Sequence, residues 1–533
     1  MERRHFLRLG AAGAAVIAAS GEGAAQSAAA QAPFDLAEAA VADLQSAMQS
    51  GALSSRSIAE RYLARMDAVD RAGPALNAVI ERNPDALDMA DALDRERRDK
   101  GPRGPLHGIP VLLKDNIDTG DRMHTTAGSL ALGDHVAARD AFVVARLRAA
   151  GCVILGKTNL SEWANFRGAR STSGWSARGG QTRNPYALDR NTSGSSAGSA
   201  AAAAANLCAI TVGTETDGSI VSPSSICGLV GIKPTVGLVS RTGIVPIAHS
   251  QDTAGPMTRS VADAALLLAA MAGADPADPA TRAGADKAAD YAASLDPGGL
   301  RGVRIGVARH YFGVNDRVDR VVEQAIVAMQ GAGAVIVDPV TVPNHDKLDA
   351  DEYEVLLYEF KADLDAYLGA LPAGAPVRSL ADVIAFNERH AVAEMPYFGQ
   401  ERMLAAAKKG PLTQATYRTA LARGRRRSGA QGIDAALKAH RLDALVAPTG
   451  SPAWPTDYVN GDHFSGGCSQ MPAVSGYPHI TVPAGFVFGL PVGVSFIGTA
   501  WSEARLIRYA YAFEQAMKAR RPPAFAATAV YPA

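Results

Sequence analysis

The sequence has few cysteines and no cluster of metal-binding residues. The four cysteines are scattered over 533 residues, at Cys152, Cys208, Cys227 and Cys468. No Cys-x-x-Cys pair occurs, and the eleven histidines show no metal-ligand spacing. The sequence therefore predicts no zinc site, no redox motif, no other metal and no cofactor. We expect the four cysteines to be buried as small apolar side chains.

An excess of charge and a long apolar run are also absent. Lys plus Arg and Asp plus Glu number 53 each, which argues against a nucleic-acid partner and gives no reason for an anionic membrane partner. The apolar run at residues 9–19 is short and rich in Ala and Gly, whereas a stable membrane span needs about 20 apolar residues. The expected partner is a small molecule or a short peptide. Nothing in the sequence specifies an oligomeric state.

The first thirty residues have the features of an export signal. Arg3 and Arg4 precede the apolar run, and small residues follow at 24–32. This order is typical of a twin-arginine signal, which carries folded proteins across the membrane. We predict a signal peptide over residues 1–30, cleaved after Ala30, and a periplasmic location. A disordered cytosolic tail is the alternative.

Apolar strands alternate with amphipathic helices through the rest of the chain, which is typical of α/β proteins. No linker is evident after Pro33, so one large domain over residues 34–533 is predicted. Residues 349–430 are richer in charge and helical by pattern, and are expected to form an insertion over the sheet and the active site. Strands are predicted at 108–113, 153–155, 207–212, 303–307, 334–337, 442–447, 480–483 and 492–497.

The stretch at 183–205 is dominated by Ser, Gly and Ala and ends in six alanines. A flexible Gly/Ser linker is one interpretation. An uninterrupted alanine helix followed by an apolar strand at 207–212 favours the core instead, where small residues let backbones approach closely.

A turn of small residues at 213–220 follows that strand and contains Ser219. Such a turn presents a serine and several backbone N–H groups at the edge of a sheet, which suits a nucleophile beside an oxyanion hole. Taken alone, a serine in a Gly-rich turn is ordinarily a turn residue. A lysine, Lys114, lies where another predicted strand ends.

Three motifs together resemble the amidase signature family. They are Leu-Lys-Asp-Asn at 113–116, Gly-Ser-Ser-Ala-Gly at 194–198, and the turn at 213–219, in the family's order and spacing. The resemblance runs from about Leu36 to the last predicted helix. The turn and residues 233–241 are most similar to bacterial peptide amidases, which hydrolyse C-terminal amides of peptides.

The resemblance implies a fold and a mechanism. The fold would be a single three-layer α/β/α domain around a mixed, mostly parallel sheet. The enzyme would hydrolyse linear amides through an acyl-enzyme, without a cofactor. Its implied residues are the nucleophile Ser219, the proton relay Ser195 after a cis Gly194–Ser195 peptide, the base Lys114, the lysine-orienting Ser196, and the oxyanion-hole N–H groups of Thr216, Asp217, Gly218 and Ser219.

The chemistry requires Lys114 to be neutral, because only an unprotonated amine accepts a proton. Its ordinary pKa of about 10.4 prevents this at pH 7 unless burial penalises the charge. The chain departs from many family members in having Asp217 for glycine, Glu215 for aspartate and Val221 for arginine. Residues 453–471 could form a wall of the substrate pocket through Trp454, Tyr458 and His463, or an ordinary surface loop.

Other interpretations use the same residues. The stretch at 194–198 matches the Gly-x-Ser-x-Gly elbow of α/β-hydrolases, with Ser196 as nucleophile, but it follows a polar loop rather than a strand. Within the family, aryl amides, fatty amides and carbamates are alternative substrates. An amidotransferase subunit acting on charged tRNA is a further alternative, which the export signal disfavours. A non-catalytic periplasmic binding protein is the non-enzymatic alternative.

Overall fold

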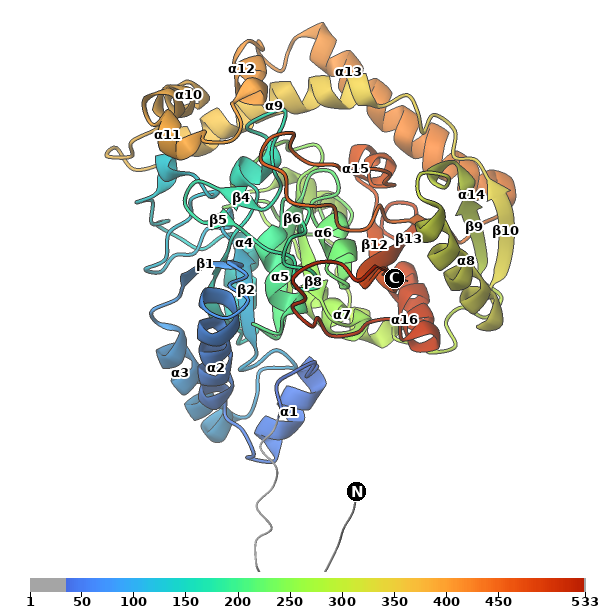
Figure 1. Ribbon diagram of the computed structural model, residues 1–533, viewed down its shortest axis with the longest axis horizontal. Coiled ribbons are helices and arrows are strands. Elements are labelled where there is room, and N and C mark those ends of the chain that lie inside the picture. Colours follow the sequence, from blue (N-terminus) through green and yellow to red (C-terminus); the bar gives the residue numbers. More distant parts are fainter. Residues whose placement is uncertain (1–34, 532–533) are drawn as a thin grey trace, which may run out of the picture. The chain divides into compact units, whose positions relative to one another are not determined.

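A large mixed sheet runs through the protein, and the computed structural model describes residues 35–531 (Figure 1). Residues from Leu36 onward form one compact unit. The predicted signal peptide, residues 1–30, lies outside the described residues and stays a prediction. Between residues 35 and 531, the structure contains no helix of the length and apolarity needed to cross a membrane.

The sheet has eleven strands in the described part of the chain. Their spatial order is β1 (Val79–Arg82), β3 (Val153–Thr158), β2 (Pro110–Lys114), β6 (Ile210–Glu215), β8 (Thr253–Thr258), β7 (Val230–Lys233), β12 (His479–Val487), β13 (Leu490–Ile497), β11 (Ala444–Pro448), β9 (Arg304–Ala308) and β10 (Val335–Val340). Two short strands, β4 (Trp175–Ser176) and β5 (Gly180–Gln181), pair separately.

The α/β class and the mixed sheet are confirmed, but the expectation of mostly parallel pairing is wrong. Across the described residues, six of the ten pairings in this sheet are antiparallel and four are parallel. For one of the six antiparallel pairs, β12 with β13, the reason is the length of the connection. Only the two residues Phe488 and Gly489 separate β12 from β13, and so short a link can join only antiparallel neighbours.

Helices cover both faces of the sheet. On one face, Ala200 of α5 (Ala197–Ala204) and Ile220, which precedes α6 (Val221–Ile226), pack with Met257 of β8. On the other, Phe513 of α16 (Glu503–Met517) contacts Phe496 of β13 at a ring distance of 5.8 Å. The other helices around the sheet are α1 (Val41–Gln49), α2 (Ser55–Arg65), α3 (Ala86–Lys100), α4 (Phe142–Ala149), α7 (Val261–Met271), α8 (Asp316–Gly331), α14 (Asp434–His440) and α15 (Gln470–Ser475).

The alanine-rich stretch belongs to the core, so it is not a linker. Every residue of α5 is buried. A Cβ at Gly198 would lie 2.3 Å from the carbonyl oxygen of Ala78 and 2.5 Å from that of Asn159. Only glycine fits this close approach, which lets α5 rest directly on neighbouring backbone. All four cysteines are buried and free, as expected.

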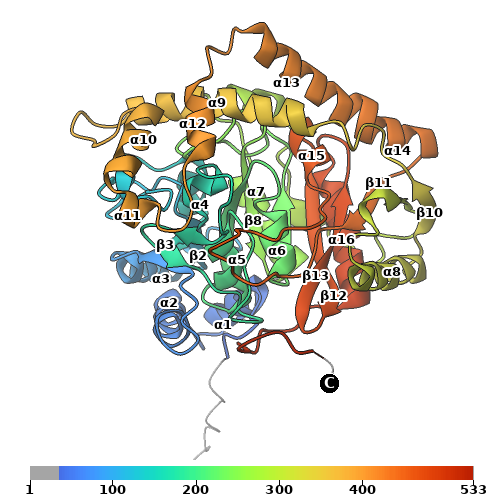
Figure 2. The ribbon, with the colours of Figure 1, turned by 45° about the horizontal axis from the view of Figure 1, so that its top comes forward.

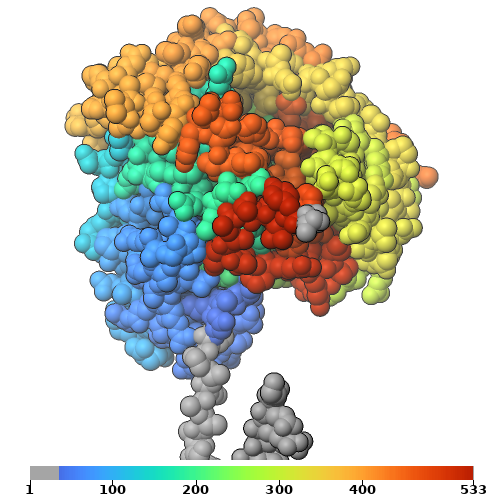
Figure 3. Space-filling view, viewed as in Figure 1, coloured from blue at the N-terminus to red at the C-terminus, as the bar shows by residue number. Residues whose placement is uncertain are grey.

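Residues 349–430 form a helical layer across one end of the sheet (Figure 2). Its helices are α9 (Asp349–Gly369), α10 (Leu380–Arg389), α11 (Ala391–Glu394), α12 (Glu401–Ala407) and α13 (Ala415–Ser428). Phe360, Leu364 and Met403 pack here against Trp163 and Phe166. Figure 3 shows this segment in gold and orange along the top of the molecule. This packing holds α9 over the end of the sheet where β2 and β6 finish.

Candidate active site

Lys114 ends β2 and is fully buried. Its strand lies between β3 and β6 in parallel, so the carboxyl ends of three strands meet around it. The Nζ atom lies within hydrogen-bond distance of Ser195 Oγ, at 2.7 Å, of Thr214 Oγ1, at 2.8 Å, and of the Thr214 carbonyl, at 3.2 Å. The structure therefore joins two residues that the sequence placed in separate motifs.

Burial tunes the lysine toward the neutral form. Desolvation lowers the pKa of Lys114 to about 7, although the charges of Asp252 and Glu215 oppose the shift. No carboxylate forms an ion pair with Lys114 among the described residues, so the amine is not held in its charged form. At neutral pH a large fraction of Lys114 is able to accept a proton.

Ser195 lies directly before α5. The Gly194–Ser195 peptide bond is cis, as predicted. The Ser195 carbonyl accepts the backbone N–H of Ser161 at 3.0 Å. Because its hydroxyl also forms a hydrogen bond with Lys114, Ser195 is held through both its backbone and its side chain.

Ser219 lies in the turn between β6 and α6. The backbone carbonyl of Ser219 accepts the N–H of Ser196 at 3.2 Å, which ties the turn to the start of α5. Beneath the turn, Glu215 Oε2 accepts the N–H groups of Ile220 at 2.7 Å and Val221 at 3.0 Å. Gly218 adopts φ +76°, a conformation that favours glycine. The turn is therefore anchored at both ends.

The same turn leaves backbone donors free. Within residues 35–531, the N–H groups of Thr216, Asp217 and Ser219 have no hydrogen-bond acceptor. Burial raises the pKa of Glu215, and the Gly218 N–H is one of the nearby groups that partly oppose this rise, so it faces the Glu215 carboxylate. Three of the four N–H groups predicted for an oxyanion hole are therefore available to a ligand.

No direct hydrogen bond joins Ser196 to Lys114 among the described residues, so the expected orientation of the lysine by Ser196 would be indirect. Ser196 Oγ donates to the Thr214 carbonyl at 3.0 Å and accepts the Thr214 N–H at 3.2 Å. Lys114 binds Thr214 directly, and Asn116 Nδ2 donates to the same Thr214 hydroxyl at 3.0 Å. Ser196 thus positions Thr214, and Thr214 positions the lysine. Sequence reasoning missed Thr214, because its contact with Lys114 depends on how β6 lies beside β2.

Two cavities meet beside Ser219. The first, of 340 Å³, is lined by Ser219, Gly194 and residues of α9. The second, of 320 Å³, shares Gly194 and Asp217 with it and is lined by Trp454, as predicted. Ser195 and Ser219 share no direct hydrogen bond among the described residues. Hydrogen bonds of this kind often tighten only when a substrate binds.

Two other predicted pocket residues lie elsewhere. Tyr458 stacks on Tyr397 at a ring distance of 4.2 Å, and His463 Nε2 bonds Asp457 Oδ2 at 2.9 Å. Neither lines the two cavities beside Ser219. The neighbouring Asp462 does, and its carboxylate accepts the indole N–H of Trp454 at 3.2 Å. Proximity in sequence to Trp454 could not show which loop side chains point inward.

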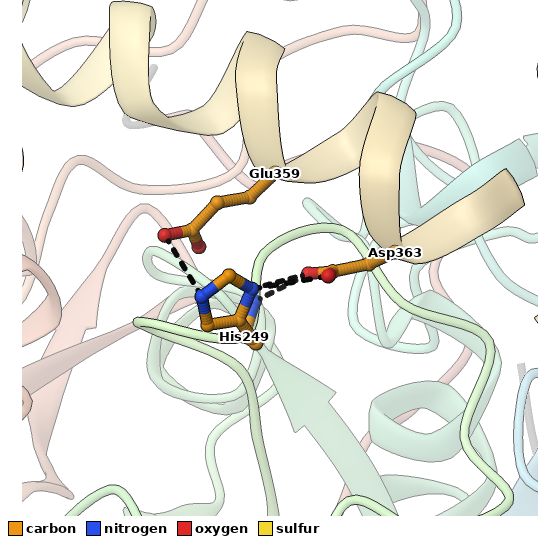
Figure 4. Close-up of side chains that lie close together, drawn as sticks. All are labelled: His249, Glu359 and Asp363. Carbon is orange, nitrogen blue, oxygen red and sulfur yellow. Dashed lines mark hydrogen bonds and ion pairs between the residues drawn. The ribbon is translucent and has the colours of Figure 1, made fainter. Parts of the chain in front are cut away.

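A histidine ties α9 to the loop beneath it (Figure 4). His249 Nδ1 lies 2.8 Å from Asp363 Oδ2, and Nε2 lies 3.4 Å from Glu359 Oε1. Burial lowers the pKa of His249, but hydrogen bonding to Asp363 and the charge of Glu359 outweigh it, so the pKa is raised. Asp252, in the same loop, accepts the Thr216 hydroxyl at 2.5 Å. The covering helix is thereby linked to the Ser219 turn.

Known proteins are similar to this chain in sequence and in fold. The amidase family model matches residues 57–507. A probable amidase of Arabidopsis thaliana is 44% identical over 504 residues, covering 93% of each chain. The native peptide amidase of Stenotrophomonas maltophilia is 56% identical, with a TM-score of 0.88, and the match covers 92% of this chain and all of that one. An amidase family protein of Bacillus anthracis is 37% identical, with a TM-score of 0.84 and 92% of each chain covered. The chain therefore belongs to the amidase signature family and is an amidase, a hydrolase of the carbon–nitrogen bonds of amides.

Proposed function

We propose that the enzyme hydrolyses the C-terminal amides of peptides through Ser219, Ser195 and Lys114. The observation that carries the catalytic part is the buried Lys114 amine, 2.7 Å from Ser195 Oγ and without an ion pair. The 56% identity to a peptide amidase supports the substrate class.

The proposed reaction begins with attack by Ser219 Oγ on the amide carbon. The proton of Ser219 passes to Ser195 Oγ, whose own proton passes to the neutral Nζ of Lys114. The free N–H groups of the turn hold the negative oxygen of the tetrahedral intermediate. The proton then returns through Ser195 to the leaving nitrogen, and ammonia departs. Water hydrolyses the resulting ester on Ser219 by the same proton path.

The polarity of the site favours peptides over fatty substrates. The 340 Å³ cavity beside Ser219 is lined by Asp217, Asp349, Glu352 and Gln470 as well as by apolar side chains such as Phe166, Ile247 and Leu356. An acyl chain placed there would cover carboxyl groups without offering them a hydrogen bond, which costs about 1–3 kcal/mol for each buried polar group. A peptide supplies N–H donors at the same positions.

We expect ammonia release from C-terminally amidated peptides, at a higher kcat/KM than cleavage of acyl anilides or fatty amides of similar size. The purified chain is assayed with the three substrate classes in parallel. Preference for anilides or fatty amides would leave the amidase chemistry and overturn the peptide assignment. Binding of peptide amides without release of ammonia would favour a binding protein instead.

The pH dependence of the reaction rate should follow the protonation of Lys114. Because the pKa of Lys114 is lowered to about 7, the base is protonated and inactive below that value and becomes active as pH rises through it. We expect kcat/KM for a neutral peptide amide to fall about tenfold per pH unit on the acid side of pH 7. Initial rates from pH 5 to 9 at constant ionic strength measure this. A profile that stays flat between pH 5 and 8 would contradict Lys114 as the base.

A further inference from the structure

The 340 Å³ cavity beside Ser219, called here the acidic cavity, carries three carboxyl groups: Asp217, Asp349 and Glu352. We propose that this cavity binds a cationic group on the acyl part of the substrate, so that amides of peptides containing lysine or arginine are preferred. The inference rests on the proposed function, because it concerns the substrate class of the same site.

The carboxyl groups form no ion pair in the described chain, although the charge of the buried Lys233 partly opposes the rise in the pKa of Asp217. Among residues 35–531, none of the three forms a salt bridge. Their partners are neutral: Gln470 Nε2 donates to Asp349 Oδ1 at 2.8 Å and to Glu352 Oε2 at 2.9 Å, and Gln251 Nε2 donates to Glu352 Oε1 at 2.8 Å. The side-chain amides of Gln470 and Gln251 thus hold Asp349 and Glu352 in place without neutralising their charge.

One acceptor in this set is empty. Asp217 Oδ1 is shielded from solvent and has no hydrogen-bond partner in the described chain. A buried acceptor without a donor costs about 1–3 kcal/mol. A cation near this carboxyl group would offset that cost through its charge, without reaching the shielded oxygen.

Proximity of the carboxyl groups also favours a cation. Burial raises the pKa of Asp217, and the charge of Glu352 raises it further. Burial raises the pKa of Glu352 as well. A cation placed between two such groups lowers both pKa values, so its binding is linked to release of any proton that they hold and strengthens as the pH rises.

The one cation of the cavity wall is directed elsewhere. Arg402 also lines the acidic cavity, but its Nη1 donates to the Asn165 carbonyl at 2.9 Å. Its guanidinium carbon lies 5.6 Å from the centre of the Phe166 ring. Tyr353 also lines the cavity and is 45% exposed. Carboxylates beside an aromatic ring are a favourable environment for ammonium and guanidinium groups.

One of the two cavities beside Ser219 has to take the acyl part of the substrate, and the proposal assigns it to the acidic cavity. In hydrolysis of a primary amide the leaving group is ammonia, which needs little space. A volume of 340 Å³ next to the nucleophile is therefore left for acyl-side residues. A lysine side chain reaches into such a space while its peptide stays at Ser219.

The test uses acetylated dipeptide amides that differ in one side chain. Lysine, norleucine or glutamate is placed at the residue that carries the amide in one series, and at the preceding residue in a second. We expect kcat/KM for ammonia release to be highest for lysine and lowest for glutamate in one series, with a ratio of about ten or more. Salt should reduce this ratio.

Variants assign the preference to the acidic cavity. Glu352→Gln and the exposed Asp349→Asn should each lower the lysine-to-glutamate ratio by about threefold or more. The matched control is Glu354→Gln on the same helix, since Glu354 pairs with Lys409 Nζ at 2.6 Å and does not line the cavity. This control should keep the wild-type ratio.

Two results would overturn the inference alone: equal kcat/KM for lysine and glutamate in both series, or a preference unchanged in both cavity variants. Failure to release ammonia from any of the six amides would instead overturn the proposed function, and the inference with it. Because norleucine amides report basal hydrolysis, the two failures are distinguishable.

Discussion

Replacing Ser219 by alanine should lower kcat/KM for ammonia release from an amidated peptide by about 10⁴-fold or more. The substitution removes one oxygen atom from a residue that is 7% exposed. The backbone contacts that hold the turn use the Ser219 carbonyl and the Glu215 carboxylate, and neither involves the lost hydroxyl. The loss should therefore be chemical, with little change in the thermal midpoint of unfolding.

The matched control for this variant is Ser224→Ala in α6. The hydroxyl of Ser224 is buried without a hydrogen-bond partner in the described chain, and it lines neither cavity beside Ser219. We expect near wild-type rates from this control. Retention of the wild-type rate by Ser219→Ala, with the protein pure and folded, would exclude Ser219 as the nucleophile.

Replacing Lys114 by methionine should lower kcat by about 10²- to 10⁴-fold, the range that general-base catalysis contributes. Methionine has a similar length and no charge, so the buried site keeps its packing and loses the proton acceptor. Raising the pH should not restore the rate, because no titratable group replaces the amine. The measurement is kcat at pH 7 and pH 9, together with the unfolding midpoint.

Lys157 provides the control for this variant. It is also fully buried, at the end of the neighbouring strand β3, and its Nζ donates to the Ile117 and His124 carbonyls and to Thr125 Oγ1. Lys157→Met leaves these acceptors unpaired, so it should lower stability by about 1–3 kcal/mol. If Lys114→Met lowers stability but keeps the wild-type activity, Lys114 is not the base.

Local patterns in the sequence predicted much of the fold because they depend on nearby residues. The buried strand at 207–212, the alanine helix after it and the turn with Ser219 follow from apolar runs and small residues. The order and direction of the strands in the mixed sheet could not be predicted from these local patterns. Strand β7 lies between β8 and β12, and this order depends on contacts between distant segments.

The active site, too, was only partly predictable from the sequence. The motifs placed Lys114 and Ser195 in one site, and the structure joins them at 2.7 Å. They did not reveal that Thr214 holds the lysine, because that contact depends on the register of β6 beside β2. The sequence also did not reveal that Asp217 and Glu352 lie in the same cavity. The two residues are far apart in the chain and come together only because α9 covers the turn.

The most direct test of the account is to look for the acyl group on Ser219. The enzyme is mixed with an amidated peptide, quenched in acid during turnover and measured by intact-protein and fragment mass spectrometry. The account predicts a mass increase equal to the peptide amide minus ammonia, on the fragment that contains Ser219, and its loss in Ser219→Ala. Acylation of a different residue, or the same label in Ser219→Ala, would contradict it.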